Sequence, residues 1–175
     1  MLFEILDNVL DETSVDHLYG YFRDERSWRF MGSGDANKNW RKFIMEIDNK
    51  HPLEKKLHSK AHEIFNSICN KDDYYLFRAY AGGYVYGTVH EIHTDGKFQG
   101  DIITVMFYLN KIWDITYGVE TIFLDQPRKN ILFSVIPKPS RALIFDGWYP
   151  HCAREVSRSC IELRMVATFK FKKKQ

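Results

Sequence analysis

The sequence predicts a mostly β protein with flanking helices, in which a double-stranded β-helix, or jelly roll, is packed against N-terminal helices. From about residue 74, short runs rich in Ile, Val, Thr, Tyr and Phe alternate with turn residues. No helical pattern separates these runs, which favours an antiparallel sandwich or barrel. With 175 residues, of which 45% are hydrophobic, we expect one domain over 1–175. Its helical front covers about 1–73 and its jelly-roll core about 74–171.

Two amphipathic helices are predicted in the front. The first has its apolar residues spaced i, i+3, i+4 and i+7, behind possible caps at 11–14. The second runs from about Pro52, which suits a first helical turn, to Cys69. Both apolar stripes are expected to face the core. The first stripe consists of Val15, Leu18, Tyr19 and Phe22, and the second of Leu53, Leu57, Ala61, Ile64, Phe65 and Ile68.

The segment between these helices has two open interpretations. Residues 26–42 are polar, contain the Gly32-Ser33-Gly34 run and show no clean periodicity. As a segment that closes over a site, they would offer Trp28 and Trp40 as flat apolar faces for a substrate. As an ordinary connection, they would place both tryptophans in the core.

Seven strands are predicted in the second part of the chain. Turn residues such as Gly82-Gly83 and Gly96 separate them. Their expected ranges are 75–80, 84–93, 102–110, 119–124, 131–136, 141–146 and 161–171.

Composition excludes several classes of protein. The formal charge of +2 provides no general field for nucleic acid, and the lysines at 170, 172, 173 and 174 are interpreted as a solvated basic tail. No stretch is long and apolar enough to span a membrane, and no secretion signal is recognised. Three cysteines without a CxxC pair predict neither disulfides nor a cysteine zinc site. A cytoplasmic location is therefore expected.

A candidate metal site begins at His93-Thr94-Asp95. Residues i and i+2 of a strand face the same side, so His93 and Asp95 can bind one metal. His90, three positions earlier, would face the other way unless a bulge intervenes. His151 is the other histidine in a comparable setting. Two imidazoles and one carboxylate are the pattern of non-heme Fe(II) sites with open coordination positions, whereas a zinc hydrolase is disfavoured because no general base is evident.

The order of motifs resembles the Fe(II)/2-oxoglutarate dioxygenases of the prolyl 4-hydroxylase-like group over about residues 75–171. Val119 departs from the group, which usually has a glycine there, and the 13 positions from His151 to Arg164 are slightly more than in several subfamilies. The motifs are His93-Thr94-Asp95, Tyr108 to Asp114, Gly118 to Thr121, Pro137 to Asp146, Pro150-His151 and Leu163 to Phe169.

The resemblance implies that His93, Asp95 and His151 hold Fe(II) and that Arg164 binds the distal carboxylate of 2-oxoglutarate. Physics agrees, because a guanidinium within an apolar strand needs an anion and offers it a planar fork. An internal salt bridge to Glu162 or Glu120 is the structural alternative, and Arg154 and Arg158 are rival assignments. Tyr108, Thr168 and Tyr80 are further candidates to contact the cosubstrate.

The implied reaction is hydroxylation of an unactivated C–H bond, with O2 as second cosubstrate, succinate and CO2 as products and ascorbate as a candidate reductant. A prolyl residue in a peptide or protein is the expected substrate. A free amino acid or small metabolite remains plausible, whereas a nucleic-acid dealkylase and a non-catalytic jelly-roll module are weaker alternatives. Besides Trp28 and Trp40, the candidate substrate contacts are Trp148, Arg154 and Arg158.

Overall fold

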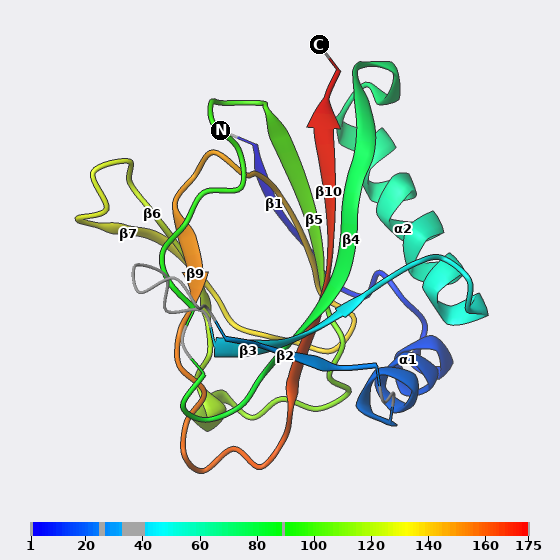
Figure 1. Ribbon diagram of the computed structural model, residues 1–175, viewed down its shortest axis with the longest axis vertical. Coiled ribbons are helices and arrows are strands. Elements are labelled where there is room, and N and C mark those ends of the chain that lie inside the picture. The colour runs from blue at the N-terminus through cyan, green and yellow to red at the C-terminus, as the bar shows by residue number, and fades with distance from the viewer. Residues whose placement is uncertain (1, 25–26, 33–40, 89, 175) are drawn as a thin grey trace.

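Two antiparallel sheets face one another in the computed structural model, which describes residues 2–24, 27–32, 41–88 and 90–174 (Figure 1). In these ranges the major sheet has the order β1-β8-β5-β10-β4-β3-β2 and the minor sheet the order β7-β6-β9. The predicted jelly-roll core with flanking helices is confirmed. The strands are β1 (Phe3–Leu6), β2 (Arg29–Gly32), β3 (Arg41–Glu46), β4 (Tyr74–Tyr84), β5 (Ile102–Tyr108), β6 (Thr121–Leu124), β7 (Ile131–Val135), β8 (Ala142–Asp146), β9 (His151–Ala153) and β10 (Arg164–Lys173).

Helices α1 (Glu12–Asp24) and α2 (Pro52–Ile68) cover the face of the major sheet that points away from the minor sheet (Figure 1). Asp11 caps α1, because its carboxylate accepts the backbone N–H of Ser14 at 2.8 Å. The His51 side chain accepts the backbone N–H of Leu53 at the start of α2. Both apolar stripes pack into the core as predicted, except that Val15 is half-buried outside it. Two short 3₁₀ helices, η1 (Lys71–Asp73) and η2 (Ile115–Tyr117), complete the described elements.

Strand β10 separates two hydrophobic cores. Because side chains alternate along a strand, Met165, Ala167 and Phe169 pack against the helices. Arg164 and Val166 point the other way, into the space between the sheets. The strand is buried on both faces, and it brings polar groups at alternate positions into the interior.

Several strand predictions were incomplete or wrong. The sequence did not reveal β1, β2, β3 or β9, and the expected strand at 84–93 does not form in the described residues beyond Tyr84, where β4 ends. There the chain turns instead: Thr88 N–H donates to the Val85 carbonyl, and Gly87 has a φ of +81°. Strand β4 continues through Gly82-Gly83, where a turn was expected.

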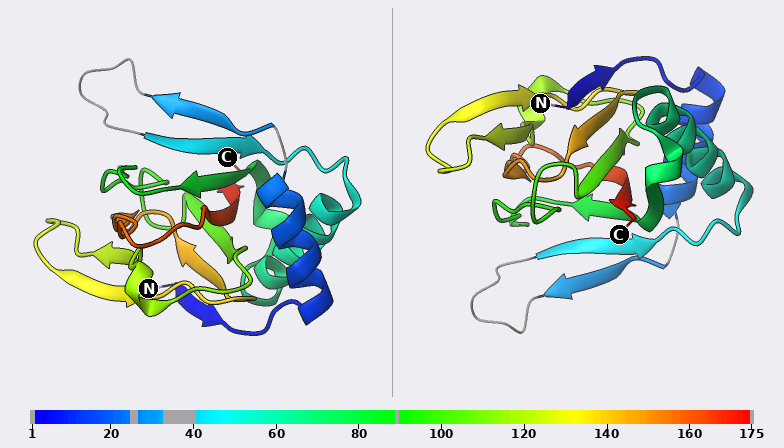
Figure 2. Two further views of the ribbon diagram at one scale, coloured as in Figure 1. Left: turned by 90° about the horizontal axis from the view of Figure 1, so that it is seen from below. Right: turned by 90° about the horizontal axis from the view of Figure 1, so that it is seen from above.

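The β2–β3 pair forms an arm at the edge of the major sheet, beside β4 (Figure 2). Trp28, just before β2, donates its indole N–H to the Phe22 carbonyl at 2.8 Å and packs against the helix-facing core. Trp40 and residues 33–40, on which the closing-segment hypothesis depends, lie outside the described residues. No helix in the described ranges is long and apolar enough to cross a membrane, and Cys69, Cys152 and Cys160 are all free thiols.

Candidate metal centre

A single backbone bridge brings two of the three proposed metal ligands together. His93 N–H donates to the His151 carbonyl at 3.1 Å, and His151 N–H donates back to the His93 carbonyl at 2.9 Å. Residues paired in this way in an antiparallel ladder present their side chains on the same side. The two imidazole centroids are accordingly 4.5 Å apart.

Both imidazoles are oriented by backbone carbonyls two residues earlier in the chain. Nδ1 of His93 lies 3.0 Å from the Glu91 carbonyl, and Nδ1 of His151 lies 2.8 Å from the Tyr149 carbonyl. A carbonyl oxygen only accepts, so each Nδ1 carries a hydrogen, and Nε2 is the ring nitrogen left for a metal. This is the tautomer that a metal-binding histidine requires.

Asp95 completes the cluster and depends on Gly147. Its backbone N–H donates to the Gly147 carbonyl at 2.7 Å. A Cβ atom at position 147 would lie only 2.6 Å from the Asp95 Cβ, so a glycine is required for this close approach. Oδ1 and Oδ2 of Asp95 are 3.4 Å and 3.8 Å from the Nε2 atoms of His93 and His151, respectively. One ligand atom from each of these residues lies within 4.8 Å of the others, a separation suited to one metal ion.

Two further side chains bind the Asp95 carboxylate. The Lys170 ammonium donates to Oδ1 at 2.6 Å, and the Thr104 hydroxyl donates to Oδ2 at 2.8 Å. The prediction that Lys170 belongs to a solvated tail is therefore wrong. Strand β10 continues to Lys173, and Lys170 points inward because it shares the face of Thr168 and Arg164.

The electrostatics favour the protonation states that bind a metal. Burial lowers the pKa of His151 to about 4. The Asp95 carboxylate raises this pKa, whereas His93 lowers it further. Burial raises the pKa of Asp95, but His151, His93 and Lys170 outweigh it and hold the pKa well below its usual value. Near neutral pH His151 is therefore uncharged and Asp95 is ionised, as metal ligation requires.

His93, Asp95 and His151, the triad, line one cavity between the sheets, and His90 lines it too without joining the triad. Its ring centroid is 4.7 Å from that of His93, while its Nε2 lies 3.4 Å from the Lys42 ammonium. The strand on which its opposite orientation was predicted does not form, so that argument does not hold. Among the described residues, the group with metal-binding separations nevertheless consists of His93, Asp95 and His151.

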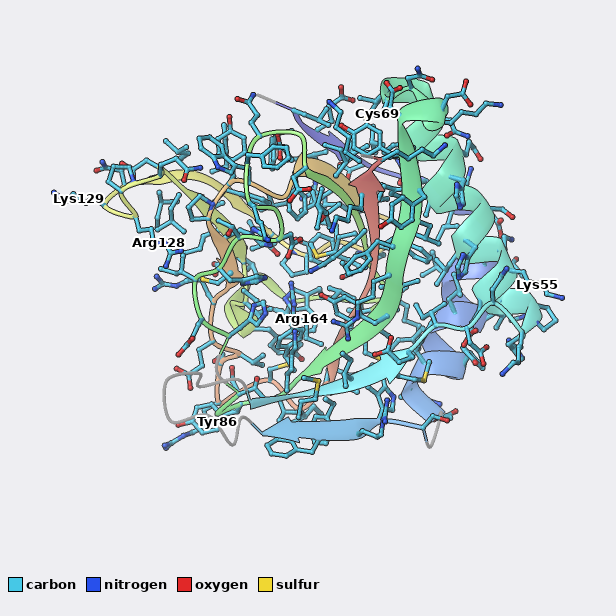
Figure 3. All side chains as sticks on the ribbon, turned by 45° about the horizontal axis from the view of Figure 1, so that its top comes forward. Lys55, Cys69, Tyr86, Arg128, Lys129 and Arg164 are labelled. Carbon is cyan, nitrogen blue, oxygen red and sulfur yellow. The ribbon has the colours of Figure 1, made fainter. Side chains whose placement is uncertain are left out.

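Arg164 is buried in the middle of the molecule, between the two sheets (Figure 3). Its side chain lines the cavity of the triad and donates from Nη2 to the Thr121 hydroxyl at 3.2 Å. The guanidinium lies over the Tyr84 and Tyr108 rings, 4.9 Å and 5.5 Å from their centroids. Its buried Nε has no hydrogen-bond acceptor, and no carboxylate of the described residues forms an ion pair with it. The site is thus suited to an anion.

The alternative internal partners of Arg164 are not in place. Glu162 accepts the Tyr19 hydroxyl at 2.7 Å, and Glu120 forms no ion pair among the described side chains. The rival arginines lie elsewhere: Arg154 is exposed, and Arg158 lies over the ring of exposed Tyr86 at 5.4 Å.

The other candidate side chains are divided between the cavity and its surroundings. Tyr80 and Thr168 line the cavity, and the Tyr108 hydroxyl meets that of Thr121 at 2.8 Å behind Arg164. Trp148 is half-buried and packs near Tyr149, away from the cavity wall. The structure adds four polar side chains that were not among the predicted site residues, namely Tyr84, Thr104, Thr121 and Lys170.

Strand register explains why these residues belong to the site. Tyr84 pairs with Arg164 across β4 and β10, and Thr104 pairs with Lys170 across β5 and β10. Gly82, two residues before Tyr84, leaves room for the tyrosine ring, because a Cβ there would lie 3.1 Å from its hydroxyl. An explicit antiparallel alignment of β4, β5 and β10 is the signal that could have identified Tyr84, Thr104 and Lys170.

Comparison with known proteins finds similarity at the level of structure. No family model and no curated protein sequence matches the chain. A prolyl hydroxylase from Trichoplax adhaerens, in complex with a hypoxia inducible factor oxygen degradation domain peptide fragment, superposes with a TM-score of 0.73 at 18% identity. The match covers 98% of this chain and 83% of that one.

Two bacterial structures agree with this. A Pseudomonas putida prolyl-4-hydroxylase has a TM-score of 0.75 at 15% identity, covering 99% of this chain and 93% of that one. HygX from Streptomyces hygroscopicus, with nickel, 2-oxoglutarate and hygromycin B bound, has a TM-score of 0.71 at 12% identity. That match covers 98% of this chain and 82% of HygX. The chain therefore has the jelly-roll fold of prolyl hydroxylases and other 2OG-Fe(II) oxygenases.

Proposed function

We propose that the protein is an Fe(II)- and 2-oxoglutarate-dependent dioxygenase. One observation carries the proposal: the triad of His93, Asp95 and His151 shares a cavity with a buried arginine whose Nε has no acceptor. Two imidazoles and one carboxylate suit Fe(II) and leave coordination positions open for other ligands. The bound iron would supply the oxidation, in which O2 and 2-oxoglutarate are consumed and succinate and CO2 are released.

Arg164 is the proposed ligand of the distal carboxylate of 2-oxoglutarate. Its guanidinium offers charge-assisted hydrogen bonds in a secluded, aromatic environment, where such bonds are strong. Thr121 fixes one end of the guanidinium, and Tyr84 covers its face. Tyr80 and Thr168 line the cavity between Arg164 and the triad and are proposed to contact the cosubstrate along its length.

A prolyl residue in a peptide or protein is the proposed substrate. Support comes from the prolyl hydroxylases among the similar structures, one of them in complex with a peptide. HygX, with hygromycin B bound, favours hydroxylation of a small molecule as the second candidate. Ascorbate remains a proposed reductant and the cytoplasm a proposed location. Neither a nucleic-acid substrate nor a binding role without catalysis has a comparable observation in its favour.

The first experiment is an anaerobic titration of the protein with Fe(II) and 2-oxoglutarate. A keto acid that chelates ferrous iron should give a weak charge-transfer band in the visible region. His93→Ala, Asp95→Ala and His151→Ala should each abolish the band, whereas His90→Ala should retain it. A band that survives His151→Ala but not His90→Ala would overturn the ligand set, and no band with the native protein would overturn the proposed function.

The second experiment identifies the substrate class. After air is admitted to the loaded protein, a library of proline-containing peptides and a pool of metabolites are examined by mass spectrometry. A gain of one oxygen atom on a prolyl residue, with matching succinate, supports the first candidate. The same gain on a small metabolite alone supports the second.

A further inference from the structure

The two oxygens of Asp95 have hydrogen-bond donors of different charge. Oδ1 accepts from the Lys170 ammonium at 2.6 Å, whereas Oδ2 accepts from the neutral Thr104 hydroxyl at 2.8 Å. The side chains of Asp95 and Lys170 are only 2% and 14% exposed, so solvent weakens their ion pair little. Of the two oxygens, Oδ1 is therefore the weaker electron-pair donor to a metal ion.

The fold fixes both donors. Lys170 and Thr104 are directly paired across β10 and β5, so their side chains leave the sheet together on its inner face. The Lys170 ammonium also lies 5.6 Å from the centre of the Tyr80 ring. A lysine at this position is thus held on Asp95 by two strands and an aromatic neighbour.

The number of Asp95 oxygens that bind a metal decides how many positions remain open. With two imidazoles and one carboxylate oxygen, an octahedral ion keeps three further positions, enough for a chelating keto acid and O2. A carboxylate that binds through both oxygens occupies one more position. The keto acid and O2 would then compete for the two positions that remain.

We propose that Lys170 and Thr104 hold Asp95 in single-oxygen coordination, with Oδ2 as the metal ligand and Oδ1 retained by Lys170. The inference rests on the proposed function, because it concerns the positions that the cosubstrate needs. Lys170 is a positioning residue in this scheme: it acts on the metal through Asp95. It also lowers the affinity for the metal, since it places a positive charge beside the ligand.

The test compares Lys170→Met with Lys173→Met, which removes an equal charge from an exposed side chain on the same strand. Co(II) replaces Fe(II) in this test because air does not readily oxidise it. In Lys170→Met, Co(II) should bind at least threefold more tightly, and its ligand-field spectrum should indicate an additional ligand. At saturating Co(II), 2-oxoglutarate should bind about tenfold more weakly. Lys173→Met should match the native protein, and Lys170→Arg should restore most of the native behaviour.

Other outcomes overturn the proposal. Weaker Co(II) binding in Lys170→Met with native 2-oxoglutarate affinity would mean that the lysine only supports the carboxylate, and no change would mean that the ion pair is incidental. If Lys170→Met does not fold, Lys170→Gln, which keeps a donor without the charge, should show the same changes at smaller size. If the native protein binds Co(II) but not 2-oxoglutarate, the proposed function fails, while the Co(II) affinity and spectrum still decide the role of Lys170.

Discussion

A buried guanidinium without a carboxylate partner is costly to the folded protein, and an incoming anion offsets that cost. Arg164 is in this situation: it is 1% exposed, and its contacts with Thr121, Tyr84 and Tyr108 leave its Nε unsatisfied. At the residue scale, the anion-binding capacity of the cavity therefore depends on one side chain.

Arg164→Ala should weaken the binding of 2-oxoglutarate much more than the binding of the metal. Loss of a charge-assisted, two-pronged contact in a secluded site costs about 3 kcal/mol, roughly a hundredfold in affinity. Calorimetry with the metal-loaded protein measures this effect. Arg158→Ala is the control, because its exposed side chain lies over Tyr86. If Arg158→Ala reduced the affinity and Arg164→Ala did not, the two assignments would be exchanged.

Gly147→Ala should disrupt the metal site without introducing any charge. The added Cβ would lie 2.6 Å from the Asp95 Cβ and 3.0 Å from the Ile102 carbonyl oxygen, so Asp95 must move. We expect at least a tenfold loss of Co(II) affinity, about 1.4 kcal/mol. Gly20→Ala in α1 is the matched control, since no atom lies within 4 Å of its added Cβ. It should leave metal binding unchanged and stabilise the helix by roughly 0.5–1 kcal/mol. Native Co(II) affinity in Gly147→Ala would contradict the argument.

The residues that local sequence could predict are those that local geometry controls. The need of Arg164 for an anion follows from its apolar flanks in the sequence. The spacing of His93 and Asp95 also marked them as a pair, but the strand assumed for them does not form, and backbone bonds to His151 and Gly147 place them instead. Tyr84 and Lys170 have no such local signal. Their places depend on how β4, β5 and β10 align, and these strands are separated by many residues in the chain.

At the scale of elements, short strands were missed because their partners, and not their own patterns, make them strands. β1 has four residues and pairs with β8, and β9 has three residues and pairs with β6. Both partners are distant in the sequence, so neither short strand has a local pattern of its own. The helices were predicted well because a 3.6-residue stripe is a local property. The same helices bury polar groups that the stripe does not reveal.

His58 is such a group, and it should make the fold sensitive to acid. It lies on α2 with its ring 5.1 Å from that of Phe169, and its buried Nε2 has no hydrogen-bond partner. Burial lowers its pKa, with His62 adding to the effect. The unfolded chain therefore binds more protons below about pH 6.5, and the free energy of unfolding falls as the pH decreases through that region.

Removing this titration should flatten the pH dependence. Between pH 7.5 and pH 5, the free energy of unfolding of His58→Phe, measured with urea, should fall less than that of the native protein. His17→Gln, at an exposed position on α1, should keep the native slope. An unchanged slope in His58→Phe would show that the acid sensitivity arises elsewhere.

At the scale of the whole molecule, the proposed ligands connect the two sheets. His151 belongs to β9 of the minor sheet, Arg164 belongs to β10 of the major sheet, and His93 and Asp95 lie in the segment between β4 and β5. A metal together with 2-oxoglutarate would contact all three parts at once. Binding to the folded state alone stabilises that state in proportion to the logarithm of ligand concentration.

Ligand binding should therefore raise the melting temperature in two separable steps. Co(II) alone should give the first increase, and 2-oxoglutarate at about 100 times its Kd should add about 2.7 kcal/mol, or roughly 5–10 °C for a chain of this size. Arg164→Ala should keep the first step and lose most of the second. Glutamate, which has both carboxylates but no keto group, should not reproduce the second step. A full second step in Arg164→Ala would show that the distal carboxylate is held elsewhere in the cavity, and His90 and Lys42 would then be the cationic or polar groups to examine next.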